Sequence, residues 1–213
     1  LRLKEGSHVE VFDGNGKQAL CLIVEHSNKK CELERISEIE DQSIPSRSLT
    51  AVVPFIKKNN FNYMIQKLTE IGVNKFMIYK PDLSDQSIAK KDFEKIISKS
   101  KEIIINVCKQ CGNNFLPNIE YYSNLENAIK QIQEDHDKYI FDTDATEYFL
   151  QDELDNDSSV TIITGPESGF SNKEIKIIAN GELKIRYLGR NILRSETAPI
   201  VVSSIIKNHF GRI

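Results

Sequence analysis

The 213-residue sequence lacks several features that would assign it to a specialised class of protein. No apolar run reaches the roughly 18 residues that a membrane-spanning helix needs, so no membrane association is predicted. No secretory signal pattern is visible, and the four cysteines do not form a disulfide framework in a chain of this length. These absences predict a protein of the reducing cytoplasm.

Excess positive charge and the usual catalytic side-chain arrangements are also absent. The formal net charge of −3 argues against a uniformly basic nucleic-acid wrapper, although a local basic patch would suffice for RNA binding. Cys108–Cys111 has CxxC spacing, but no second CxxC or nearby histidine pair completes a metal site, so we expect these thiols in or just past a helix. No Ser-His-Asp arrangement is present, and we expect the four scattered histidines at the surface: His8, His26, His136 and His209.

The first 48 residues are predicted to form a small β-rich domain. Alternating residues at 9–12 and an apolar stretch at 19–24 flank Asp13–Gly16, a strong hairpin-turn signal. A third alternating stretch follows at 31–36. Short strands at such close spacing favour a small barrel, with a domain boundary near residue 48.

From residue 49 onward, strand and helix signals alternate. This alternation predicts an α/β domain with a mostly parallel sheet covered on both faces. We expect strands at 49–55, 76–79, 138–142, 160–164 and 183–188, and helices at 58–71 (ending at Gly72), 90–108, 124–133, 172–180 and 199–206.

A tight loop, Gly165–Ser171 (GPESGFS), connects a predicted strand to a predicted helix. Its glycines allow close backbone approach to a ligand, and the helix N-terminus beyond it favours a negatively charged group. Either Ser171 or Asn172 can cap this helix, and Glu174 completes a capping box if Ser171 is the cap. A structural turn explains the loop equally well. Because it is neither GxGxxG nor a P-loop, dinucleotides and nucleoside triphosphates are disfavoured.

A second loop, Leu188–Ala198 (LGRNILRSETA), leads into the last predicted helix. Ser195 or Thr197 can cap that helix. Arg194 can hold a phosphate or polarise a base, or it can form a purely structural pair with Glu196.

Together, the two loops suggest a small-molecule site at the ends of parallel strands. A third polar segment, Asp142–Asp144, also follows a predicted strand. It can line the same cleft or form a solvated turn.

Four collinear motifs resemble those of RsmE-type ribosomal RNA methyltransferases. Gly165–Ser171 resembles the family's GPEGGFS loop, and Leu188–Ala198 resembles its LGxxILRxETA motif. Gln66–Val73 (QKLTEIGV) is similar to QKxTELGV, and Leu1–Gly6 with Phe12–Gly14 matches LRLKxG…FDG. The resemblance covers essentially the whole chain, except for a segment that we expect to be missing before Leu1.

The resemblance implies a SPOUT-class enzyme. Residues 1–48 would form a PUA-like β-barrel that presents RNA, and residues 49–213 a parallel-sheet methyltransferase domain whose trefoil knot binds S-adenosyl-L-methionine. Such enzymes work as homodimers, with each active site near the subunit interface. They methylate N3 of a specific uridine in 16S, small-subunit ribosomal RNA, as RNA or as 30S particle, and need no metal.

The resemblance also implies roles for residues of both loops. Arg194 would stabilise negative charge that develops on the uracil carbonyls, and Glu196 would orient Arg194 and anchor the last helix. The implied cofactor-binding residues are Thr164, Gly165, Pro166, Glu167, Gly169, Leu188, Gly189, Ile192, Leu193, Arg194 and Ala198.

Three residues depart from the family's pattern. Ser168 replaces a glycine, which is feasible only if its φ is not strongly positive. Gln86 and Asn113 stand where the family usually has arginines, and the lost charge would weaken phosphate contacts. Two other interpretations therefore remain open: a catalytically weakened RNA-binding or ribosome-assembly module of the same fold, and a SPOUT methyltransferase that acts on another RNA.

Overall fold

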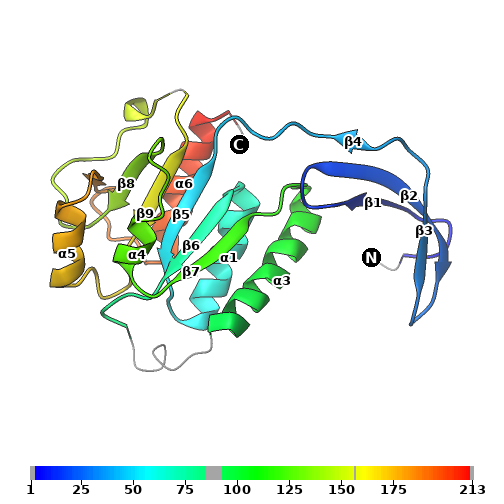
Figure 1. Ribbon diagram of the computed structural model, residues 1–213, viewed down its shortest axis with the longest axis horizontal. Coiled ribbons are helices and arrows are strands. Elements are labelled where there is room, and N and C mark those ends of the chain that lie inside the picture. Colours follow the sequence, from blue (N-terminus) through cyan, green and yellow to red (C-terminus); the bar gives the residue numbers. More distant parts are fainter. Residues whose placement is uncertain (1–2, 85–92, 156, 212–213) are drawn as a thin grey trace.

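A computed structural model of the protein describes residues 3–84, 93–155 and 157–211. The chain forms a small antiparallel sheet followed by a larger parallel sheet that is flanked by helices (Figure 1). The antiparallel strands end at Asp41, and the first parallel strand begins at Leu49.

The N-terminal sheet is built around one long strand. β2 (Lys17–His26) pairs antiparallel with β1 (His8–Phe12), β3 (Cys31–Arg35) and the two-residue β4 (Glu40–Asp41). The first three strands agree with the predicted ones, whereas β4 is too short to leave a sequence signal. β1 and β3 do not pair with each other in the described part of the chain, so closure into a barrel stays a prediction.

The predicted hairpin turn joins the N-terminal sheet to the rest of the molecule. The Gly16 amide donates to the Asn114 carbonyl over 3.0 Å, and the Leu116 amide donates to the Gly14 carbonyl over 2.9 Å. A backbone bridge between Asn15 and Phe115 lies between these bonds. The turn thus adds a short strand-like contact to the larger domain.

The larger sheet has six strands, and all of its neighbouring strands are parallel, as the alternation of elements predicts. Its order is β10-β8-β9-β5-β6-β7, so the chain crosses the sheet several times. The strands are β5 (Leu49–Pro54), β6 (Lys75–Tyr79), β7 (Asn118–Tyr122), β8 (Asp137–Phe141), β9 (Val160–Thr164) and β10 (Lys184–Arg186).

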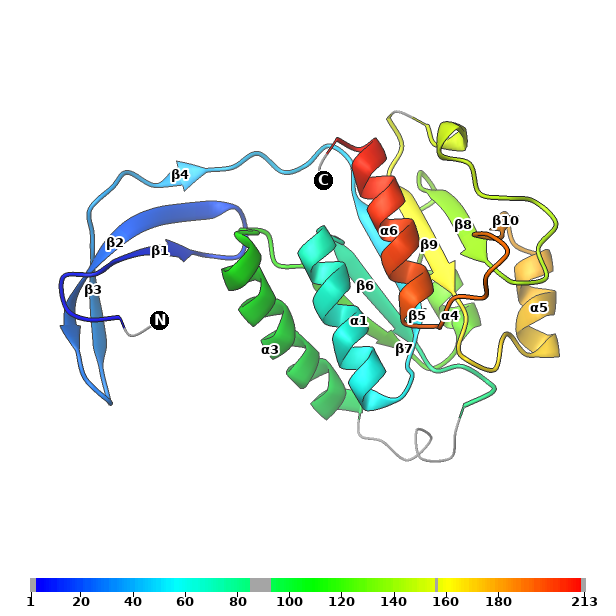
Figure 2. The same ribbon diagram turned by 180° about the vertical axis from the view of Figure 1, so that it is seen from behind.

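Helices cover both faces of this sheet, as opposite views show (Figure 1 and Figure 2). One face carries α1 (Lys58–Ile71), α3 (Phe93–Cys111) and α6 (Thr197–His209), and the other carries α4 (Leu125–Ile129) and α5 (Asn172–Ala179). Alternate side chains of β5 pack into the two cores: Ala51 and Val53 into the first, Val52 into the second. Burial on both faces explains the continuous apolar run of β5.

Several helix ends follow the sequence signals. Gly72 ends α1 in the left-handed conformation, with φ of 89°. The predicted helix 90–108 corresponds to α3, which runs on to Cys111, while residues 90–92 lie outside the described residues. Both CxxC thiols are therefore in the helix, as predicted. Burial raises the pKa of Cys108 to about 11. The described residues contain no group of three side chains suited to a metal ion.

The helix predicted at 124–133 is wrong in length. α4 begins after Asn124, whose side chain accepts the Asn127 amide, but it ends at Ile129. Isolated turns follow, in which the amides of Gln131 and Ile132 bond three residues back. Ile132 is still buried, so the apolar pattern continues beyond the helix that it suggested.

The predicted cap of the last helix is also wrong. Neither Ser195 nor Thr197 caps α6: Glu196 precedes it in helical conformation, without a side-chain cap. The chain enters through a turn in which the amides of Thr197 and Ala198 both donate to the Arg194 carbonyl. Because this turn is already helical, no extended cap residue is needed. The helix runs from 197 to 209, longer than the predicted 199–206.

One histidine is not at the surface as expected. His136 is 7% exposed, and its Nδ1 lies 2.9 Å from the hydroxyl of Thr161. Burial lowers its pKa. The polar neighbours of His136 in the sequence gave no sign that the turn before β8 folds inward. Separately, none of the helices in the described ranges is long and apolar enough to cross a membrane.

Candidate functional site

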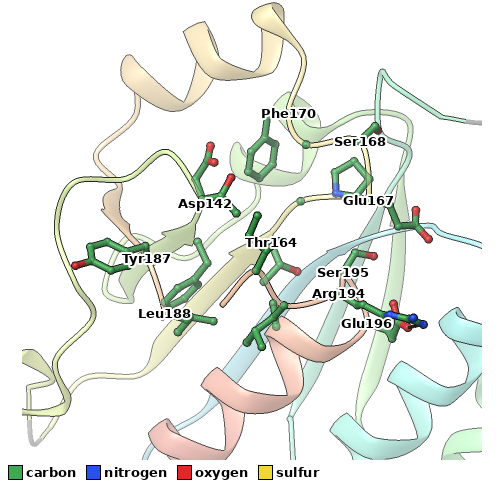
Figure 3. A pocket seen from close by; sticks show the side chains of 18 of the residues that line it. Asp142, Thr164, Glu167, Ser168, Phe170, Tyr187, Leu188, Arg194, Ser195 and Glu196 are labelled. Atoms are coloured by element: carbon green, nitrogen blue, oxygen red, sulfur yellow. Dashed lines mark ion pairs between the residues drawn. The ribbon is translucent and has the colours of Figure 1, made fainter. Parts of the chain in front are cut away.

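A cavity of about 1040 Å³ lies at the carboxyl ends of the strands, bordered by both predicted loops (Figure 3). Gly165 and Gly189, far apart in the sequence, line it together. Every residue predicted for the site also lines it, although the individual roles stay predictions: Thr164, Gly165, Pro166, Glu167, Gly169, Leu188, Gly189, Ile192, Leu193, Arg194, Glu196 and Ala198.

The first loop is held by a capping box. The Ser171 hydroxyl accepts the Glu174 amide over 3.1 Å, and the Glu174 carboxylate accepts the Ser171 amide over 2.8 Å. Of the two predicted caps, Ser171 is therefore the actual one. Glu174 is 2% exposed and also accepts the backbone amide of Asp82, so it ties α5 to the segment after β6.

Backbone geometry explains the glycines of the first loop and tolerates its serine. Gly169 has φ of 71°, which favours glycine. A Cβ on Gly165 would lie 3.1 Å from the ring of Phe170. Ser168 is not among the residues with positive φ, so the condition for a serine there is met. Its hydroxyl donates to the Leu83 carbonyl over 2.8 Å.

The end of β9 forms one wall of the cavity. The Tyr79 hydroxyl donates to the Thr164 carbonyl over 3.0 Å. Burial, with a smaller contribution from Glu174, raises the pKa of Tyr79 well above its usual value, so this hydroxyl stays a donor. The hydroxyl of Thr164, by contrast, is buried and has no hydrogen-bond partner among the described residues.

The second loop starts from a strand extension. The backbone carbonyl of Tyr187 accepts a hydrogen bond from the Phe149 amide, and the Tyr187 amide donates to the Glu147 carbonyl. Residues 147–149 therefore lie beside Tyr187. The guanidinium of Arg186 fixes this segment through Glu153, at 2.8–3.1 Å, and through Glu147, at 2.6 Å.

The charged pair of the second loop is loose. Arg194 Nη1 and Glu196 Oε1 are 4.0 Å apart, and the Arg194 side chain is 82% exposed. Such a pair contributes little to stability. Within the part of the chain that the structure describes, the other carboxylate oxygen of Glu196 is buried without a partner, as is the hydroxyl of Ser195. Buried polar atoms are nearly always paired, so these two atoms beside the cavity are available to a bound molecule.

Sequence reasoning missed part of the lining. Lys57 and Asn60 line the cavity from the start of α1, just after β5. The rule that ligands bind at carboxyl ends of parallel strands would have found them. The same rule made Asp142–Asp144 a candidate for the cleft, and this segment does line the cavity. The remaining additional lining residues are Phe141, Ser168, Phe170, Ile175, Tyr187, Arg190, Asn191 and Ser195.

Of the other two departures from the family pattern, only Asn113 lies within the described residues. Asn113 is not among the lining residues. Its side chain accepts the Phe115 amide over 3.0 Å, which shapes the loop that contacts the N-terminal hairpin. Gln86 lies outside the described residues.

Comparison with known proteins decides the family. A sequence family described as "RNA methyltransferase domain" matches residues 42–207. The ribosomal RNA small subunit methyltransferase E of Mesomycoplasma hyopneumoniae is 30% identical over 201 residues, covering 94% of this chain and 85% of that protein. The chain belongs to the ribosomal RNA small subunit methyltransferase E family. The resemblance drawn from the four motifs is thereby confirmed, and the chain is an RNA methyltransferase.

A further family member agrees with this assignment, and solved structures share the fold. The family member of Buchnera aphidicola from Schizaphis graminum is 30% identical over 214 residues, 99% of this chain and 85% of that protein. The fold matches the ribosomal RNA small subunit methyltransferase E of Neisseria gonorrhoeae, solved with S-adenosyl methionine, with a TM-score of 0.82 at 22% identity over 97% of this chain and 85% of that chain. A solved structure from Thermotoga maritima matches with a TM-score of 0.75 at 26% identity, over 100% and 88% of the two chains.

Proposed function

We propose that this methyltransferase transfers a methyl group from S-adenosyl-L-methionine to N3 of a specific uridine in 16S ribosomal RNA. The observation that carries the proposal is the convergence of the two family loops on one cavity at the strand ends. Relatives named ribosomal RNA small subunit methyltransferase E, and a structural neighbour bound to S-adenosyl methionine, support the substrate and the donor.

The cavity suits S-adenosyl-L-methionine in its volume and in the polar groups of its lining. Its volume of about 1040 Å³ lies at the upper end of the range for small-molecule sites. Thr164, Ser195 and Glu196 supply two hydroxyls and a carboxylate oxygen that are buried and unpaired. Backbone groups of residues 164–169 and 188–193 would hold the adenine and ribose, with the methionine end beside Arg194.

The residues of the site do the positioning. When bound, S-adenosylmethionine supplies a methyl group made electrophilic by the adjacent sulfonium. Uracil N3 carries a proton in a base pair, so the uridine must be unpaired or flipped out of its stack. The long, exposed side chain of Arg194 stabilises the negative charge on the uracil carbonyls. Glu196 restricts the orientation of the guanidinium group.

The finer architecture of the family is part of this proposal. Residues 49–213 form the methyltransferase domain with its trefoil knot, and residues 1–48 form the PUA-like barrel that presents RNA. The path of the chain supports the knot: β10 lies at the sheet edge beside β8, yet α6, the next helix, packs on β9 and β5. A homodimer in the cytoplasm that uses no metal completes the proposal.

The decisive experiment measures methyl transfer from labelled S-adenosylmethionine to unmodified 30S particles and to naked 16S RNA, followed by mapping of the modified nucleotide. We expect one N3-methyluridine per particle. Calorimetry with the donor gives an independent readout. Donor binding without transfer would indicate the weakened RNA-binding module, and methylation of a different RNA would indicate another SPOUT activity.

A further inference from the structure

A second, smaller cavity adjoins the donor cavity. It has a volume of about 250 Å³ and shares Lys57 and residues 166–168 with its larger neighbour. The rest of its lining comes from the ends of β5 and β6: Phe55, Pro81, Leu83 and Ser84. None of these four lines the larger cavity, so the smaller one is a separate compartment at its border.

Hydrogen bonds fix the wall of this compartment. The Ser168 hydroxyl donates to the Leu83 carbonyl over 2.8 Å, and the Ser171 hydroxyl donates to the Asp82 carboxylate over 2.9 Å. The Asp82 amide in turn donates to buried Glu174 over 3.2 Å. Three bonds therefore join the first loop to the segment after β6. Ser168, the serine in place of the family's glycine, makes one of them.

The lining has the chemistry of a pyrimidine pocket. Leu83, which is 49% exposed, offers an apolar surface for a flat ring, and the buried side chains of Phe55 and Pro81 also contribute to the lining. Lys57 and Ser84 bring donors, which uracil needs for its two carbonyl oxygens. The volume is below the ~300–1,000 Å³ of sites for drug-sized molecules, so it fits a single base.

The position of Lys57 links the two compartments. Its side chain lines both cavities and is exposed. It precedes α1 and extends from the carboxyl end of β5, on the same strand-end edge as the donor cavity. A cation there attracts the partial negative charge of a carbonyl oxygen on a base that reaches the border.

We propose that the smaller cavity receives the target uracil, with Lys57 donating to one of its carbonyl oxygens at the border with the donor cavity. This inference rests on the proposed function, because it specifies where the acceptor base of that reaction binds. A flipped base needs apolar surfaces to stack on and polar groups along its edge, and both are present here.

Filling the cavity is the main test. Ser84→Trp places a large ring in it, while Ser98→Trp, at an exposed position of α3, makes the same change outside both cavities. We expect Ser84→Trp to lower methyl transfer to 30S particles roughly 100-fold while the Kd for S-adenosylmethionine stays within about twofold. Ser98→Trp should change neither. Full activity of Ser84→Trp, or loss of donor binding, would overturn the inference.

A binding measurement gives a readout that does not depend on turnover. A short oligouridylate carrying one 4-thiouridine is irradiated with the protein and the crosslinked peptide is mapped. We expect crosslinks to residues 55–57 or 81–84, and their loss in Ser84→Trp. Crosslinks confined to other segments contradict the pocket.

Lys57 provides a second variant in case Ser84→Trp does not fold. Lys57→Gln should lower kcat roughly 100-fold with unchanged donor affinity, and Lys57→Arg should recover most of it because the charge returns. Equal activity of Lys57→Gln and wild type would contradict the role. If wild-type protein transfers no methyl group to 30S particles, the proposed function itself fails. If it does and these variants remain active, only the uracil pocket fails.

Discussion

The two loops that border the donor cavity differ in how many of their polar side chains have hydrogen-bond partners within the protein. In the first loop, Ser168, Ser171 and Glu174 all have hydrogen-bond partners. In the second, the Ser195 hydroxyl and one oxygen of Glu196 are buried and have no partners in residues 3–84, 93–155 and 157–211. Its Ile192 is 81% exposed. The side chains of the first loop are therefore paired within the protein, whereas two polar groups of the second loop have no partner among the described residues.

This difference has an energetic meaning. A buried polar group without a partner costs about 1–3 kcal/mol, and two such groups in one loop lower the stability of the free protein. A ligand that supplies the missing hydrogen bonds regains this free energy on binding. The first loop, with its capping box, contributes pre-organisation instead.

The largest expected effect is on methyl transfer, from a change in the second loop. Arg194→Ala should lower methyl transfer roughly 100- to 1000-fold, because a group that stabilises developing charge is lost. The free energy of unfolding should change by less than about 0.5 kcal/mol, since the side chain is exposed and its ion pair is loose. Single-turnover assays with 30S particles measure the transfer, and urea unfolding measures the stability; calorimetry with the donor checks that the donor still binds. Lys173→Ala, on exposed α5, is the matched loss of charge. Near-normal turnover of Arg194→Ala would refute the role.

The next effect contrasts the stability of the two loops. Glu174→Ala should lower the unfolding free energy by about 2 kcal/mol, because the amides of Ser171 and Asp82 lose their acceptor. Ser195→Ala should leave it unchanged or raise it by up to about 1 kcal/mol, because the change removes a buried hydroxyl that has no partner among the described residues. Urea unfolding of both variants makes the comparison, with Glu182→Ala as an exposed control. Equal losses at Glu174 and Ser195 would remove the distinction.

Hydrogen exchange tests whether ligand completes only the second loop. With S-adenosylmethionine at ten times its Kd, opening of a segment that must close on the ligand slows roughly tenfold. We expect this slowing for amides of residues 190–196 and a smaller one for 169–174. Mass spectrometry of peptides with and without donor resolves the two segments. Equal protection of both segments would mean that the first loop is not complete beforehand.

The smallest effect concerns the bond that fixes the first loop to the segment after β6. Ser168→Gly should lower the unfolding free energy by about 1 kcal/mol, since it removes the hydrogen bond to Leu83 and frees the backbone. Ser168→Ala removes only the hydroxyl and separates these two causes. Thermal unfolding measures both variants. An unchanged midpoint for both would show that the bond to Leu83 contributes nothing.

The sequence predicted the parallel sheet and the cavity-lining residues because both depend on strong local signals. Apolar runs mark β5 and β9, and the glycines and the Ser171–Glu174 pair mark the first loop. Motifs that resemble a family then assigned several lining residues at once. These signals are local, so they survive without knowledge of the tertiary structure.

The errors arise where tertiary contacts overrule local pattern. β7, with Asn118 and Glu120 among its five residues, lacks an apolar run because it is an edge strand. His136 is buried by the turn before β8, which its polar neighbours concealed. Lys57 has no motif, and only the packing of the loops beside β5 brings it to both cavities.

The burial of α6 constrains how the protein is made. Val202 and Ile206 are fully buried in the same core as Leu49, the first residue of the parallel sheet. Residues separated by some three-quarters of the chain must therefore meet before that core is complete. During synthesis, the apolar surface of β5 and its neighbours stays exposed to solvent until α6 has been synthesised. Slow formation of this core is the expected consequence, because its contacts join residues that are far apart in the sequence.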